Sequence, residues 1–381
     1  MEEKELEFLF TKKNINGESI LQLKDGKLLF YNPIGGARII LYSQKTFQKI
    51  YELNFDKLIK KLEEENAEFD EEDDDEKPWL KSRWSRRYSR DYNDKISIKE
   101  LDNGLLLIGY NKYLIEFYPY ENIYSSKVVK KFKATIMDII VLSEKRFIII
   151  ANDNIKEVIK EKEKYVIKKK YPFKENWKDK PSRSTIDIEY SDFHQYYCSY
   201  LLPNDKLLLN NFSIESFDYT GCCSHPTEHL TYSKIILIDL KNFEEIASTK
   251  AFNKYLRVII LKNIIVVQVC KNLTLYDINS LQPIKDIKLE RYYNFLYNYN
   301  NKYLIAISLE DNNDNINIFK IENNDLIKSY STSKYLRFMK KYKSNDYFIE
   351  EYINNPLLIL KDKRIIIIYE NKLYILKINF D

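Results

Sequence analysis

Residues 263–287, NIIVVQVCKNLTLYDINSLQPIKDI, decide the fold of this chain. They begin with a continuous apolar run, turn into an alternating strand that ends in a polar corner, and finish with a second amphipathic strand. A strand that is covered on both faces loses its alternation and becomes a solid apolar run. A strand with one solvated face keeps the alternation. The segment therefore predicts a covered inner strand followed by strands nearer to solvent.

The same pattern recurs along most of the chain. The solid apolar runs are KLLFY (27–31), GLLLIGY (104–110), RFIIIA (146–151), KLLLN (206–210), NIIVVQV (263–269), YLIAISL (303–309) and RIIIIY (364–369). Recurrence of one strand unit is typical of repeat architectures, in which each unit buries its faces against its neighbours. In a β-propeller the inner strands of each blade are sandwiched between neighbouring blades, so these runs favour that fold.

Three segments resemble the third strand, turn and fourth strand of a WD40 blade: LIDLKNFEEI (237–246), LYDINSLQPIKDI (275–287) and IFKIENNDLIKSY (318–330). Tyr276-Asp277 and Ile238-Asp239 stand where that family has Trp-Asp, whereas Phe319-Lys320 lacks the Asp. The family's Gly-His pair is missing from every blade. The resemblance covers most of the chain and implies a WD40-like β-propeller, whose subfamily the degenerate motifs leave open.

The cassettes predict one all-β domain over residues 1–381, with seven four-stranded blades. The expected blades are 19–53, 96–133, 134–173, 185–252, 254–290, 291–332 and 334–381. An orphan strand at 6–11 should pair with the last strand, at 372–380, and close the propeller, because closure removes exposed sheet edges. A β-sandwich, two smaller β domains, or six or eight blades are the alternatives.

A charged insertion, 54–94, lies between the first two blades. Apolar residues at helical spacing predict a short amphipathic helix over 56–65. An acidic run, 63–76, and a basic-aromatic run, KPWLKSRWSRRYSRDY (77–92), follow it. Adjacent blocks of opposite charge are typical of a disordered, self-attracting segment.

The basic-aromatic run offers candidate partner-binding residues: Trp79, Arg83, Trp84, Arg86, Arg87 and Tyr88. Guanidinium groups interleaved with rings suit an acidic protein partner or, alternatively, stacking on RNA. Ser89 follows two arginines and a tyrosine, as in sites of kinases that prefer basic residues, and a phosphate there would add negative charge to a basic cluster. The alternative is a solvated loop without a role.

A second candidate site lies in an irregular insertion, 174–234, in or before the fourth blade. It contains His194, Cys198, Cys222, Cys223, His225 and His229. Thiolates and imidazoles suit a structural zinc ion, and four such ligands would leave no open position for catalysis. Free cysteines are equally ordinary small core residues, and Cys270, which ends an apolar run, is expected in the core. The cofactor prediction is none, with structural zinc as the alternative.

Charge and motifs favour a non-catalytic scaffold that binds other proteins. The chain has 61 basic and 57 acidic residues, so no strong field favours nucleic acid. It lacks GxSxG, phosphate-loop and HExxH motifs; a hydrolase-like enzyme using the propeller funnel or the blade-four insertion is the alternative. The longest apolar stretch, 258–270, is interrupted by Lys262 and Asn263, which disfavours a membrane span.

Cellular context follows from the cysteines and the first residues. Four cysteines in 381 residues make no disulfide framework. The acidic start lacks an apolar segment of the secretory type. We therefore expect a cytoplasmic or nuclear protein, either a monomer or a subunit of a hetero-complex.

Overall fold

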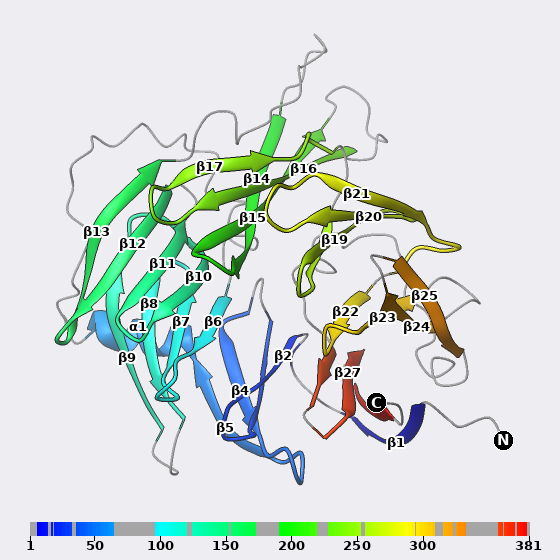
Figure 1. Cartoon of the computed structure of the whole chain (residues 1–381). Helices are drawn as coiled ribbons and strands as arrows, with labels where there is room; N and C mark the ends of the chain where they lie inside the picture. The colour runs from blue at the N-terminus through cyan, green and yellow to red at the C-terminus, as the bar shows by residue number, and fades with distance from the viewer. Residues whose placement is uncertain are drawn as a thin grey trace. The chain divides into compact units, whose positions relative to one another are not determined.

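The computed structural model describes residues 6–13, 17, 19–32, 36–64, 96–119, 124–151, 154–172, 190–218, 228–252, 256–293, 295–308, 315–322, 325–332, 357–360, 362–369 and 372–378. Within them, 28 strands form seven four-stranded antiparallel sheets, the blades of a seven-bladed β-propeller (Figure 1). The predicted fold class is confirmed. The chain divides into two compact units, Met1–Phe173 with Ile353–Asp381, and Lys174–Tyr352. That they make a single domain stays a prediction.

The first unit holds four blades. Blade seven contains β26 (Leu357–Ile359), β27 (Arg364–Tyr369), β28 (Lys372–Ile378) and β1 (Leu6–Lys13). Blade one contains β2 (Ser19–Gln22), β3 (Leu28–Tyr31), β4 (Arg38–Tyr42) and β5 (Lys49–Asn54), followed by α1 (Phe55–Glu64). Blade two contains β6 (Ile96–Glu100), β7 (Leu106–Tyr110), β8 (Tyr113–Tyr118) and β9 (Ser125–Lys131). Blade three contains β10 (Ile136–Ser143), β11 (Arg146–Ala151), β12 (Asn154–Glu161) and β13 (Lys164–Pro172).

The second unit holds three blades. Blade four contains β14 (Tyr190–Leu202), β15 (Lys206–Asp218), β16 (Glu228–Asp239) and β17 (Glu244–Ser248). Blade five contains β18 (Arg257–Ile260), β19 (Ile264–Val269), β20 (Asn272–Asp277) and β21 (Pro283–Lys288). Blade six contains β22 (Phe295–Tyr299), β23 (Tyr303–Ser308), β24 (Asn315–Glu322) and β25 (Asp325–Thr332).

The two ends of the chain meet in blade seven. Strand β1 pairs antiparallel with β28, from Leu6 opposite Ile378 to Lys13 opposite Lys372, and forms the outer strand of this blade (Figure 1). The predicted pairing of the orphan N-terminal strand with the last strand is confirmed.

The Asp of the degenerate Trp-Asp pairs shapes the turn between third and fourth strands. The Asp277 carboxylate accepts hydrogen bonds from the Asn279 and Ser280 amides, at 3.0 and 2.9 Å, and from the Ser280 hydroxyl at 2.8 Å. The hydroxyl and then the amides hold the pKa of Asp277 below its usual value. Asp239 accepts the Lys241 amide at 2.9 Å in the same way. A short carboxylate that caps its own turn explains why Asp stands there.

Every outer strand carries a β-bulge. In each of the seven described blades, the register between the third and the fourth strand shifts by one residue. A bulge increases the local twist and disrupts the row of unpaired backbone groups that a sheet edge presents. The outer edges of the blades are therefore shielded from pairing with other chains.

The solid apolar runs are buried, as predicted. Leu105, Leu106, Leu107 and Ile108 are at most 1% exposed, and each hydrophobic cluster of the first unit joins adjacent blades. The glycine that interrupts this run has a packing cause: a Cβ on Gly109 would lie 2.6 Å from Ile136 Cγ2 of blade three. Cys270 is an exception to the prediction. It is exposed with φ 52° in the turn to β20, because the strand already ends at Val269.

Candidate functional site

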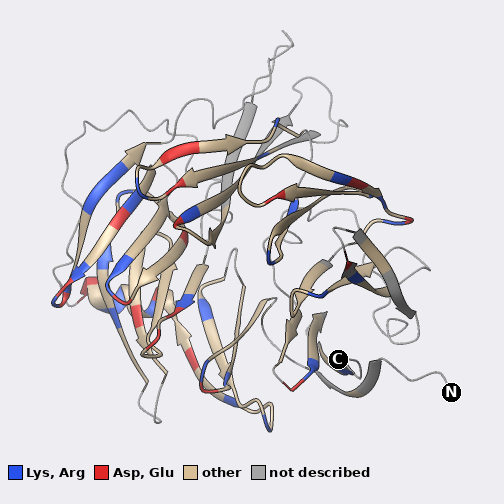
Figure 2. Cartoon of the chain, in the orientation of Figure 1, with Lys and Arg blue, Asp and Glu red and all other residues tan. Residues whose placement is uncertain are grey.

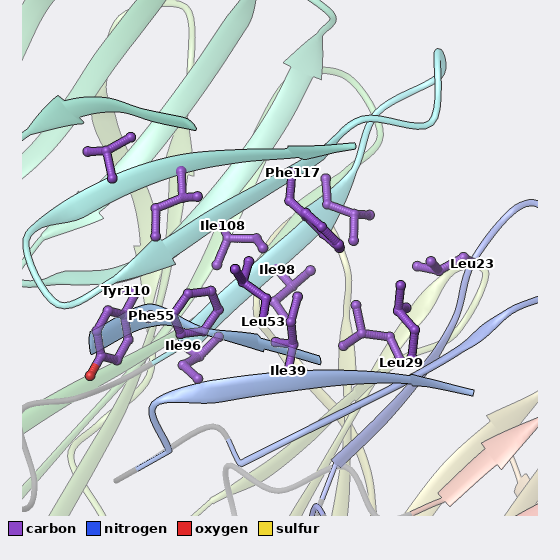
Figure 3. Packing of buried hydrophobic residues seen from close by; sticks show 14 residues of the cluster. Leu23, Leu29, Ile39, Leu53, Phe55, Ile96, Ile98, Ile108, Tyr110 and Phe117 are labelled. Carbon is purple, nitrogen blue, oxygen red and sulfur yellow. The ribbon is translucent and has the colours of Figure 1, made fainter. Parts of the chain in front are cut away.

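The start of the charged insertion is anchored on blade two by α1. The predicted helix is confirmed, displaced by one residue at each end. Asn54 Oδ1 accepts the Lys57 amide at 2.9 Å and caps the helix N-terminus. Phe55 is fully buried, and its ring centroid lies 4.8 Å from that of Tyr110. The two rings lie side by side in Figure 3. Burying a Phe of this kind contributes about 2 kcal/mol.

Hydrogen bonds fix the direction of α1. The Tyr110 hydroxyl donates to Asp56 at 2.7 Å, and the Tyr113 hydroxyl donates to Glu63 at 3.3 Å. Both tyrosines flank the turn between β7 and β8. The first and last turns of the helix are thus tied to the same turn of blade two, and the insertion leaves the described chain at Glu64.

The long connections lie at one end of their blades. In a four-stranded antiparallel blade, the turn after the first strand and the turn after the third strand lie at the same end. The connection from the second to the third strand and the connection to the next blade lie at the opposite end, which we call the connection end. At the connection end, 24 residues separate β25 from β26, and 31 residues separate α1 from β6. Turns at the opposite end have six residues or fewer.

The predicted partner-binding and phosphorylation residues lie outside the described residues. These are Trp79, Arg83, Trp84, Arg86, Arg87, Tyr88 and Ser89. The two readings of this run, binding to an acidic protein and stacking on RNA, stay predictions. The structure fixes where the described part of the charged insertion ends, at the C-terminal end of α1, which follows the connection end of blade one.

Blade four departs from the other blades in the length of its strands. Strands β14, β15 and β16 have 13, 13 and 12 residues, whereas the other described strands have nine or fewer. Strand β17 covers only the last part of β16, from Ile236 to Asp239. From Tyr190 onward, the region predicted as an irregular insertion thus forms regular strands. These three strands extend blade four toward its connection end.

The candidate zinc ligands are partly placed by this extension. In β14, His194 lies opposite Ile214 of β15, and Cys198 lies opposite Asn210 of β15. His229 of β16 lies opposite Ser216 of β15. Cys222, Cys223 and His225 lie outside the described residues. Two Cα atoms four residues apart on one strand are about 13 Å apart, too far for His194 and Cys198 to share one zinc ion. Zinc therefore stays a hypothesis for a ligand set that omits one of them.

A buried carboxylate joins blades two and three. Glu116 of β8 is 3% exposed, and its carboxylate accepts hydrogen bonds from the Lys160 ammonium of β12, from the Tyr165 hydroxyl of β13 at 2.7 Å and from the Tyr118 hydroxyl at 3.3 Å. Burial and then Glu116 raise the pKa of Tyr165, and the same two causes raise that of Tyr118. Sequence reasoning missed this group, although a charge inside the apolar run YLIEFY was its signal.

A second buried carboxylate joins the first strands of the same two blades. Asp138 of β10 accepts hydrogen bonds from the Ser97 hydroxyl of β6 at 2.8 Å and from the Ile139 amide at 2.9 Å, and lies 3.4 Å from the Lys99 ammonium. The pKa of Tyr31 in blade one is raised to about 12, chiefly by burial and secondly by the negative charge of Asp138. A hydrogen bond with Ser19 acts in the opposite direction and lowers it. Asp138 interrupts the apolar run IMDIIVLS. The Ser97 hydrogen bond and the Lys99 ion pair link blade two to blade three.

The described residues contain neither a metal-ligand cluster nor a membrane-spanning helix. No group of three or more His, Cys, Asp or Glu among them is arranged to hold a metal ion. No described helix has the length and apolar character needed to cross a bilayer.

Comparison with known proteins supports the fold. No protein-family model and no curated protein matches the chain. The β-propeller domain of Cps50 (Swd1) from Myceliophteria thermophila is similar in structure, with a TM-score of 0.52, 11% identity, and coverage of 98% of this chain and 100% of that one. BamB from Moraxella catarrhalis has a TM-score of 0.47 at 10% identity, covering 99% and 98%. Sqt1 from Saccharomyces cerevisiae has a TM-score of 0.46 at 10% identity, covering 98% and 99%. The chain has the WD40-like β-propeller fold, and at these identities the likeness concerns the fold alone.

Proposed function

We propose that this protein is a non-catalytic scaffold whose connection ends bind other proteins. The observation that supports this proposal is the asymmetry of the blades. Short, internally bonded turns lie at one end, and the helix, the extended blade-four strands and the long connections lie at the other. Binding residues are commonly carried on loops that a rigid sheet framework positions. The basic-aromatic run at 77–92 and the blade-four extension are the segments proposed to contact partners.

The use of the buried carboxylates favours binding over catalysis. A general base needs a free lone pair near a substrate. Glu116 accepts three hydrogen bonds from side chains of its own and the next blade, and Asp138 faces Ser97 and Lys99. Both groups therefore fit a structural role, and the hydrolase-like alternative has to rely on other residues of the propeller funnel or on the blade-four insertion. The RNA-binding alternative relies on the run 77–92.

The proposed partners are proteins of the cytoplasm or nucleus, and the chain is a monomer or a subunit of a hetero-complex. The test is cross-linking and affinity purification of the tagged chain from its own organism. One variant replaces residues 65–92 by a short Gly-Ser linker and keeps α1. We expect it to lose partners that cross-link to the connection end of blades one and two.

A matched control changes the opposite end of the blades. Lys45→Glu and Lys241→Glu alter exposed turn residues without touching a long connection. This double variant should retain every partner. If the linker variant kept all partners while the control lost them, the binding surface would lie at the short turns and the proposal would be wrong.

A further inference from the structure

The outer strands of blades two and three have an unusual charge. Strand β9 contains three lysines and β13 contains four, and neither strand contains an acidic residue. The five other outer strands, β1, β5, β17, β21 and β25, together contain six lysines and six acidic residues. The excess of positive charge is thus confined to two strands.

These two strands lie on neighbouring blades and contact each other. Lys127 of β9 lies 4.0 Å from Glu163, in the turn that leads into β13, so the two basic strands are continuous across the blade boundary. Exposed lysines on them are Lys127, Lys164, Lys168, Lys169 and Lys170, which we call the lysine surface. Figure 2 shows the blue segments along β13.

Protection of the sheet edge does not account for the lysine surface. Lysines on an edge strand do discourage pairing with other chains. However, all seven outer strands already carry a bulge, and the other five together carry as many acidic residues as lysines. Glu161 pairs with Lys168 and Glu163 lies near Lys127, so part of the positive charge is neutralised locally.

We propose that the lysine surface binds an extended acidic segment of a partner protein. This inference rests on the proposed scaffold function and names the chemistry of one partner. The lysines of β13 span seven residues, from Lys164 to Lys170, about 20 Å of extended chain, and an extended acidic peptide can contact their ammonium groups without pairing with the bulged backbone edge.

The composition of the surface favours protein over nucleic acid. Both strands carry lysine and no arginine, the residue that grips phosphates with two hydrogen bonds. Their aromatic residues are Tyr165, which is buried, and Tyr171, which is half-buried, so bases find no exposed ring on them to stack on.

The test measures anisotropy of a fluorescein-labelled oligoglutamate peptide bound to the full chain. Lys168→Gln with Lys169→Gln should weaken its affinity about fivefold, since an exposed ion pair contributes up to about 1 kcal/mol. Lys285→Gln with Lys288→Gln, on strand β21, where Asp286 lies between the two lysines in sequence, is the matched control and should leave affinity unchanged. Raising the salt from about 0.05 to about 0.3 M should weaken binding to the unmodified chain.

A charge swap guards against a folding defect. Lys168→Glu with Lys169→Glu should lose oligoglutamate and gain an oligolysine peptide. Equal losses in the β13 and β21 variants would overturn the proposal, as would a single-stranded RNA that binds tighter than oligoglutamate and depends on the same lysines. The proposal would also be overturned if the triple variant Asp73→Asn, Asp74→Asn, Asp75→Asn bound oligoglutamate more tightly. The chain's own acidic run would then be the segment that occupies the lysine surface. None of these results alters the cross-linking test of the scaffold itself.

Discussion

The ion pair between blades two and three gives a quantitative test of how the blades are held together. Replacing Lys160 by Met keeps most of the aliphatic stem and removes the ammonium, which leaves the Glu116 carboxylate, 3% exposed, with two phenol donors. Breaking a fully buried pair costs about 3–5 kcal/mol. Lys160 is 18% exposed and the two hydroxyls remain, so we expect a smaller loss of unfolding free energy, about 2 kcal/mol.

The assay is urea unfolding followed by far-ultraviolet circular dichroism, with a double-mutant cycle. Glu116→Gln in the Lys160→Met background removes the unpaired charge, so the double variant should be more stable than the sum of the single losses by at least about 1 kcal/mol. Lys320→Met is the control, since its pair with Glu322 is nearly half exposed and solvent screening leaves it little contribution to stability. If Lys160→Met cost no more than this control, the ion pair would not hold the blades together.

Three further outcomes are expected. Deleting residues 1–13 removes the outer strand of blade seven and should lower the melting temperature of the whole chain; an unchanged temperature would contradict the role of the β1–β28 pairing. Because the pKa of Tyr31 is raised in the folded protein, its contribution to stability is intact below pH 10, the pKa of an unfolded tyrosine. That contribution falls by up to about 2 kcal/mol as the pH rises to about 12. The Tyr31→Phe variant should therefore lose less stability at alkaline pH than the unmodified chain, as measured by urea unfolding at several pH values. Phe55→Ala should cost about 3 kcal/mol and speed hydrogen exchange in α1, whereas exchange that matches the unmodified chain would mean α1 is held by other contacts.

Much of the fold could be predicted because the repeat leaves its pattern in each cassette. Each of the seven predicted blade ranges corresponds to one sheet, with β1 added to the last and β5 ending one residue beyond the first, since a strand covered on both faces has to be apolar at every position. The Asp of the WD40-like turns could be recognised because a turn that caps itself uses neighbours in sequence. The pairing of β1 with β28 followed from a strand left over at each end of the chain.

Other features depend on contacts between residues far apart in the sequence. The long strands of blade four were expected as an irregular insertion, because YSDFHQYYCSY and NFSIESFD mix polar residues into their strands without a solid run. Cys270 looked like the end of a core strand, and only the position of the turn exposes it. For the candidate sites, sequence pattern could nominate residue types, but ligand geometry depends on register: Cys198 and His194 share a strand at a spacing that no single zinc ion bridges.

Polar residues inside solid apolar runs carry information that the runs themselves lack. A carboxylate or amide there costs several kcal/mol unless it finds a partner, so its presence requires one. In three cases the partner belongs to the adjacent blade. Glu116 meets Lys160, Asp138 meets Ser97, and the Asn210 side-chain amide donates to the Leu256 carbonyl at 3.4 Å. An apolar run can pack on any other apolar surface, whereas Glu116, Asp138 and Asn210 each bond to a group that the adjacent blade supplies. These residues therefore favour the pairing of neighbouring blades that the structure shows.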